Sequence, residues 1–200
     1  ASQPVAPGPH QVEILGDSLR AQTTITLTPA APLEGQPFRS ARTTEAGQRA
    51  TGNGNNATLP IDQFRRGMIT QLFYVTNWYH DKLFLLGFDE AAGNFQLANF
   101  SGMGLGNDRV LAEGQDSAGT NNANFSTPPD GQSGRAQMFR FTGPTIDRDG
   151  SLDTEILIHE LTHGTSNRLI GNPAGLNWDP GVGMGEGWSD FYALSLLNNT

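Results

Sequence analysis

The sequence contains no cysteine, which excludes disulfide bonds, thiolate metal sites and cysteine nucleophiles. Charged residues are also scarce, at 16% of the chain, against about 25% in ordinary globular domains. The hydrophobic fraction is a modest 36%, but 25 glycines bring the apolar share to an ordinary level. The 200 residues can therefore build the core of one large domain or two small ones, and wholesale disorder is excluded.

Positively charged residues are few: the chain has 12 Lys and Arg against 20 Asp and Glu, which gives a net charge of −8. This balance argues against nucleic-acid binding, which usually needs a concentrated basic patch, and disfavours an anionic membrane surface. No apolar run approaches the roughly 20 residues of a membrane span, and no secretory signal is visible. The chain begins at Ala1 without an initiator Met, so we expect a processed or excised piece of a longer protein.

The first 58 residues are expected to form an extended segment with one short strand and a linker, followed by a folded region over residues 59–200. Alternating β-branched and apolar residues predict the strand at Thr23–Thr28, and a run of Gly and Asn at 52–56 predicts the linker. Further short strands are expected at Phe95–Phe100, Arg109–Ala112 and Ala136–Phe141, between clusters of Gly, Asn, Asp and Pro.

Three helices are expected in the second region. The first spans Asp62–Leu86, where apolar residues recur every three or four positions and Gly87 provides a stop. The second spans Ser151–Asn167, with Asp149 or Ser151 as its cap, and the third spans Gly183–Asn198. His80 and Asp81 lie on the first helix, where we interpret them as a solvent-edge pair beside packed aromatic residues.

The second helix carries the pattern H-E-x-x-H at residues 159–163. His159 and His163 lie one turn apart on one helix face, so their imidazoles can converge on one cation, and neutral imidazole suits zinc. Glu160 projects beside that cation, where it can accept a proton from water. The flanking apolar residues predict a buried helix, in which a His-Glu-His cluster without an ion would be costly.

A catalytic zinc ion needs a third protein ligand and one open position. No third histidine lies nearby, so the ligand is expected to be a downstream carboxylate. We favour Glu186, which opens the third helix among glycines that permit close backbone approach, and Asp179 before Pro180 is the alternative. Asp190 lies four residues beyond Glu186, where it can accept the outer N–H of a ligating histidine and fix its tautomer.

The motif region resembles the fungalysin family of secreted zinc metallopeptidases. The resemblance is carried by His159–Gly164, Ser166–Leu169, Gly183–Phe191, Gly119–Phe125, Thr127–Gly131 and Ala91–Gln96, and it extends over about residues 60–195. It implies an α+β fold that forms the N-terminal half of a thermolysin-like metallopeptidase. In that fold, twisted and irregular β structure packs on the long helix and on the motif helix, and the third helix completes the zinc site.

The resemblance also implies roles for individual residues. His159, His163 and Glu186 would be zinc ligands, Glu160 the general base, and Asp190 the partner of a ligating histidine. The segment at residues 121–123 resembles an edge strand that binds substrate backbone, so the Asn122 side chain and the Ala123 carbonyl would hold an extended peptide. From its residues alone, the segment at 121–122 is typical of a turn.

Family members continue past this point into a mostly helical C-terminal half, which forms the far wall of the cleft. A Tyr or His that stabilises the oxyanion in thermolysin-like enzymes is not identified in this sequence, and nothing places His80 in that role. An acidic run just before the motif favours a helix N-terminus, and a calcium site is its second interpretation; its members are Asp147, Asp149, Asp153 and Glu155.

The expected function is that of a secreted, extracellular zinc endopeptidase, made as a zymogen with an inhibitory propeptide, as the resemblance implies. Its partners would be protein or peptide substrates, the propeptide and the missing C-terminal half. An alternative is an inactive or assembly fragment with a structural zinc site that needs a separate C-terminal half. A weaker alternative is a zinc hydrolase that acts on substrates other than peptides.

Overall fold

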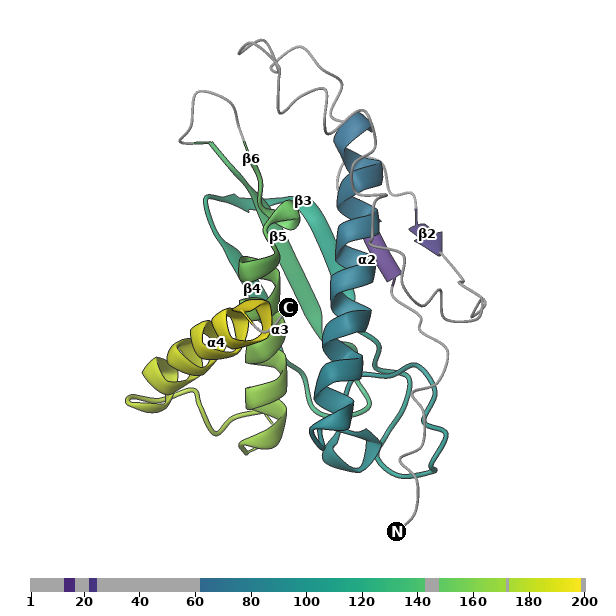
Figure 1. The fold of residues 1–200 in the computed structure, drawn as a ribbon. Helices are drawn as coiled ribbons and strands as arrows, with labels where there is room; N and C mark the ends of the chain where they lie inside the picture. Colours follow the sequence, from purple (N-terminus) through teal and green to yellow (C-terminus); the bar gives the residue numbers. More distant parts are fainter. Residues whose placement is uncertain (1–12, 17–21, 25–61, 143–147, 172, 199–200) are drawn as a thin grey trace.

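The computed structural model describes residues 13–16, 22–24, 62–142, 148–171 and 173–198. In this part of the chain, helices pack against a mixed β-sheet (Figure 1), which confirms the predicted α+β class. The helices are α2 (Asp62–Leu85), α3 (Thr154–Leu169) and α4 (Gly181–Asn198). The strands are β1 (Glu13–Gly16), β2 (Gln22–Thr24), β3 (Leu111–Thr120), β4 (Ala123–Ser126), β5 (Arg135–Phe141) and β6 (Arg148–Asp149).

The strand order in the sheet is β2-β1-β3-β5-β4, and β6 pairs with the far end of β5. The three inner strands β1, β3 and β5 are parallel, whereas β2, β4 and β6 are antiparallel to their neighbours. No strand was predicted at β1, which pairs with β3 and so joins the N-terminal segment to the sheet. β2 overlaps the strand predicted at Thr23–Thr28, of which residues 25–28 lie outside the described residues. The boundary between residues 58 and 59 stays a prediction.

The long helix α2 agrees with the prediction to within one residue at its end. Its apolar stripe faces the core, and the stripe residues that the structure describes are buried: Met68, Leu72, Val75, Tyr79 and Leu83. Gly87 has a φ of 102°, and the Phe88 N–H donates to the Leu83 carbonyl oxygen at 2.9 Å. A glycine is favoured here because an L side chain is strained at this φ, so Gly87 ends the helix as predicted.

Helix α3 lies over β4 and β5 beside α2, with Leu157, Ile158 and Leu161 in the common core. Its cap is Asp153, whose Oδ1 accepts hydrogen bonds from the N–H groups of Glu155 and Ile156. This corrects the predicted cap: Asp149 instead caps the short 3₁₀ helix at Gly150–Leu152, in which Ser151 lies.

The buried phenol of Tyr79 joins α2 to α3. Its hydroxyl donates to Thr162 Oγ1 at 3.1 Å and lies 3.0 Å from Thr165 Oγ1. Burial raises the pKa of Tyr79 to about 12, partly opposed by these hydrogen bonds, so the phenol keeps its proton.

The strand predicted at Phe95–Phe100 is wrong, because this segment is an irregular loop with bends. Its backbone N–H groups donate to carboxylates instead of to a neighbouring strand: Gln96 to Asp108, and Phe100 and Ser101 to Glu90. The strands predicted at Arg109–Ala112 and Ala136–Phe141 fall on the start of β3 and on β5. None of the helices described combines the length and apolar character that crossing a membrane requires.

Candidate metal centre

Three side chains from α3 and α4 bring their ligand atoms together. The Nε2 atoms of His159 and His163 lie 3.0 Å apart, and Glu186 Oε2 lies 3.1 Å from the first and 3.3 Å from the second. The histidines converge because they are one turn apart on α3. Glu186 reaches them because small residues of α4 are buried where it packs on α3; these are Gly185, Ser189 and Ala193.

The chemistry and spacing of these atoms fit zinc. Two imidazoles and one carboxylate form a donor set that zinc accepts, and tetrahedral ligands about 2.0–2.2 Å from the ion lie about 3.3–3.6 Å apart. The observed triangle needs only a small expansion to reach that spacing. Among the residues described, these three form the cluster that can hold a metal ion. The side chain of Glu186 is 57% exposed and that of His159 is 21% exposed, so the cluster is open to solvent on one side.

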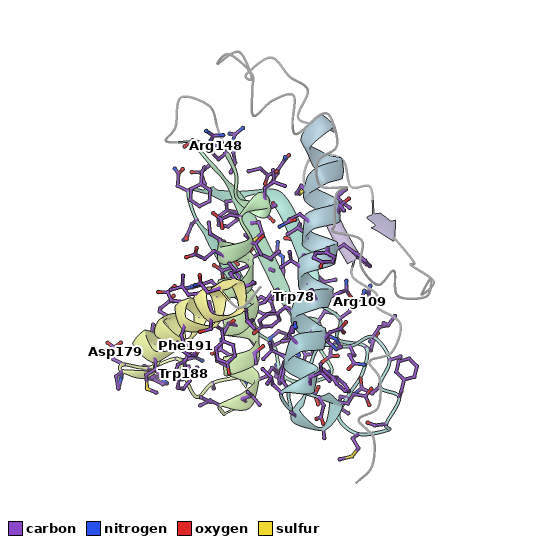
Figure 2. All side chains as sticks on the ribbon, in the orientation of Figure 1. Trp78, Arg109, Arg148, Asp179, Trp188 and Phe191 are labelled. Atoms are coloured by element: carbon purple, nitrogen blue, oxygen red, sulfur yellow. The ribbon has the colours of Figure 1, made fainter. Side chains whose placement is uncertain are left out.

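Asp190 and Asp179, the two other carboxylates downstream of the motif, occupy different positions. Asp190 Oδ1 lies 2.8 Å from His159 Nδ1, the ring nitrogen that faces away from the cluster. Asp179, the alternative ligand, is exposed and lies before α4 at the outer end of that helix in Figure 2. The structure therefore brings Glu186 into the cluster and Asp190 behind His159.

Glu160 is 7% exposed and lies next to His159 on α3. Burial raises the pKa of Glu160 to about 7; the charge of Glu186 adds to this shift, whereas His159 opposes it. Burial also lowers the pKa of His163; the charge of Glu186 opposes this shift and His159 adds to it. The site thus combines a poorly solvated carboxyl group with an imidazole that favours its neutral, ligating form.

β4 ends the described sheet, and its backbone is positioned to accept a further strand. The Phe139 N–H donates to the Asn122 carbonyl oxygen at 3.3 Å, and Asn124 lies opposite Gln137. Since hydrogen-bonded and non-bonded pairs alternate along an antiparallel ladder, the N–H and C=O groups of Ala123 and Phe125 face the free edge.

The Ala123 side chain is buried in the core, so its backbone alone is available to a ligand. Asn122 lies just before the strand with its side chain exposed.

The C-terminal end of α3 is anchored by Arg168, whose side chain is 1% exposed. Its Nη1 donates to the fully buried carboxylate of Asp108 at 2.8 Å and lies 3.4 Å from Asp130. The guanidinium also donates to four backbone carbonyl oxygens, those of Gly93, Pro128, Pro129 and Gln132. One side chain therefore fastens two loops to the helix that carries both histidines.

Two other sequence expectations concern residues outside this cluster. His80 lies 3.1 Å from Asp81 and 3.2 Å from Gln96 through its two ring nitrogens, within a polar network at the end of α2. In the acidic run, Asp153 and Asp149 cap helices, and Asp149 also accepts a hydrogen bond from Gln115. Asp147 lies outside the described residues. A calcium site stays a prediction.

Comparison with protein families identifies the fold that surrounds this cluster. The model of the fungalysin metallopeptidase family matches residues 25–200. The chain belongs to this family. The fungalysin match covers α2, α3, α4 and strands β3 to β6, so the α+β architecture is the thermolysin-like fold that the resemblance implied. It also extends into the N-terminal segment, where the sequence showed little resemblance.

Fungal proteins named as extracellular metalloproteinases are close relatives of this fungalysin chain. It is 56% identical over 138 residues to extracellular metalloproteinase 2 of Trichophyton rubrum, covering 68% of this chain and 22% of the relative. It is 53% identical over 143 residues to extracellular metalloproteinase 3 of Arthroderma otae, covering 70% and 23%. Extracellular metalloproteinase 4 of Trichophyton tonsurans is 50% identical over 145 residues, covering 71% and 23%. The chain spans less than a quarter of the length of these curated relatives.

Sequence reasoning gave no role to Arg168 or to Asp108. A signal for the arginine was present, because residues 157, 161, 164 and 168 follow the helical period along the buried side of α3. A charged residue in register with such a stripe must be paired, since an unpaired buried charge is costly. No comparable periodicity marks Asp108, which lies in a loop.

Proposed function

We propose that this chain contains the metal site of a secreted zinc endopeptidase. The observation that carries the proposal is the convergence of His159, His163 and Glu186 within 3.3 Å of one another on two packed helices. Its family and the naming of its relatives as extracellular metalloproteinases support the same activity and location. Zinc held by these residues would polarise the scissile carbonyl and lower the pKa of the attacking water.

The chain's own residues supply the proton transfers and the substrate position. Glu160 accepts a proton from the attacking water and delivers it to the leaving amine as the peptide C–N bond breaks. The Asn122 side chain and the free edge of β4, with the Ala123 carbonyl, hold the peptide as an added antiparallel strand. This edge favours peptides over other hydrolysable substrates, because main-chain hydrogen bonds recognise an extended backbone.

Asp190 keeps His159 in the tautomer that presents Nε2 as a ligand, by accepting the proton on Nδ1. Replacing Asp190 with Asn removes the charged acceptor and is expected to weaken zinc binding about tenfold, because partners of ligating histidines typically contribute 10- to 100-fold. The dissociation constant is measured by competition with a chromogenic chelator. Asp179→Asn serves as the matched control and should bind zinc like the wild type. Equal affinities for the two variants would contradict the role of Asp190.

A second candidate function is favoured by the outer face of α4. Apolar side chains are exposed there, among them Phe191 at 63% (Figure 2), Met184 and Leu194, and also at Val182 in the first turn and at Trp178 (81%) before the helix. Because Met184, Phe191 and Leu194 follow one another at spacings of seven and three residues, they share one face of α4, and an exposed apolar face of this kind favours an interaction site. In this alternative, the chain is an inactive or assembly fragment with a structural zinc site, and it needs a separate C-terminal half, which would cover α4. A propeptide is a further proposed partner, in keeping with synthesis as a zymogen.

The deciding experiment measures zinc stoichiometry and peptide hydrolysis on the same 200-residue preparation. We expect one zinc ion per chain, cleavage of a mixed peptide library, loss of cleavage after chelation, and recovery on adding zinc back. Stoichiometric zinc without cleavage would support the assembly fragment. Cleavage of esters or amides, but of no peptide, would support a different zinc hydrolase. Absence of zinc binding would contradict all three functions.

A further inference from the structure

Two glycines and two phenylalanines form a closely packed group between α3 and the sheet. A Cβ atom added to Gly164 of α3 would lie 2.6 Å from the Phe125 ring and 3.1 Å from the Phe95 ring. A Cβ atom added to Gly134, just before β5, would lie 2.7 Å from both rings. The tips of the two rings thus occupy the space that side chains at these glycines would need.

The Phe125 ring has little freedom to move away from Gly164. Phe95 meets it edge-on, with ring centroids 5.6 Å apart, and Gly134 lies against the same Cε1 and Cζ atoms that face Gly164. Phe95 is itself held by the Arg168 guanidinium, 4.0 Å from its ring centroid, and by Phe88 at 6.3 Å. A methyl group at position 164 therefore requires the tip of the Phe125 ring to shift, and we expect that shift to strain β4, which carries Phe125.

This contact connects the two halves of the proposed active site. Gly164 directly follows the ligand His163 on α3, whereas Phe125 belongs to β4 and presents its backbone N–H and C=O to the free edge. We propose that Gly164 and Phe125 form a positioning pair that sets the distance between the zinc ligands and the peptide-binding edge. The inference rests on the proposed endopeptidase function and adds the element that fixes its geometry.

The first test is Gly164→Ala in the zinc-loaded protein. We expect kcat/KM for an extended peptide to fall roughly 10- to 100-fold, as a misplacement of about 1 Å can cause, with a raised KM and unchanged zinc affinity. Helix propensity cannot explain such a loss, because alanine is the better helix former. Gly183→Ala is the matched control, since a Cβ there meets nothing within 4 Å, and it should keep the wild-type kcat/KM.

The second test asks whether the loss comes from this particular contact. Phe125→Leu shortens the side chain that opposes position 164, so combining it with Gly164→Ala should remove the clash. The double variant is expected to recover to within about threefold of Phe125→Leu alone, as residues in direct contact show non-additive effects. Wild-type activity in Gly164→Ala, or a double variant impaired by the sum of the single losses, would overturn the positioning role.

Failure of the proposed function is distinguishable from failure of this inference. A wild-type chain that binds zinc and cleaves no peptide would contradict the endopeptidase activity whatever the variants show. The positioning role is then read from the dissociation constant of a hydroxamate-capped tripeptide, which spans the metal and the strand edge. We expect Gly164→Ala to weaken the binding of this tripeptide, and the double variant with Phe125→Leu to recover it. Equal affinity across all variants, or no binding by the wild type, would overturn the inference.

Discussion

Glu160→Gln is expected to lower kcat about 10²- to 10⁴-fold, while one zinc ion per chain stays bound. Glu160 is 7% exposed and lies beside His159, so the substitution keeps the size and packing of the side chain and removes only its capacity to accept a proton. Glutamine has no basic group to take the proton of the attacking water or to return it to the leaving amine. Single-turnover hydrolysis of a peptide, together with metal analysis of the same sample, measures both quantities.

Glu155→Gln provides a matched control on the same helix. Glu155 is exposed in the first turn of α3, so its substitution makes the same change of charge away from the ligands and should leave kcat unchanged. Hydrolysis at the wild-type rate by Glu160→Gln would show that another group accepts the proton. Loss of zinc from that variant would instead show that Glu160 supports the ligands rather than the chemistry.

The centre was largely predictable because its geometry is local to two helices. The i and i+4 spacing of His159 and His163 fixes their imidazoles on one face whatever the rest of the fold does. The third proposed ligand is different, because Glu186 lies 23 residues after His163 and no local period spans that distance. Periodicity alone left Asp179 open as an alternative. Glu186 is brought to the cluster by a tertiary contact, the packing of small α4 residues on α3.

The long helix was predictable for the same reason, whereas the sheet was less so. A continuous apolar stripe predicts α2. The apolar residues at Phe95–Phe100 instead lie in a loop whose N–H groups donate to the carboxylates of Asp108 and Glu90. Side-chain carboxylates far along the chain carry no local signal, so they cannot be read from the segment itself. The strand β1 is missed for a related reason, since its pairing with β3 joins residues about a hundred positions apart.

Arg168→Met is expected to reduce the free energy of unfolding by about 3–5 kcal/mol, the cost of breaking a buried ion pair by removing one partner. Both side chains of the Arg168–Asp108 pair are at most 1% exposed, so solvent cannot replace the lost donor. Four carbonyl oxygens in two loops lose the hydrogen bond from Arg168 as well. Urea denaturation of the chelator-treated protein measures the change without a contribution from the metal. Arg148→Met is the control: Arg148 is exposed, and surface substitutions usually stay within about 0.5 kcal/mol.

A double-mutant cycle separates the ion pair from the carbonyl contacts. Asp108→Asn alone removes the charge that Arg168 neutralises and leaves the guanidinium with Asp130 at 3.4 Å as its remaining carboxylate partner. In the double variant neither charge is left buried and unpaired, so its destabilisation should be smaller than the sum of the two single values by 0.5 kcal/mol or more, on the order of measured coupling energies. Strict additivity would show that Arg168 acts through the loop carbonyls alone. Since Arg168 also holds Phe95 against Phe125, any loss of structure at this end of α3 should reach the proposed peptide-binding edge of β4 before it reaches the proposed zinc ligands one and two turns earlier.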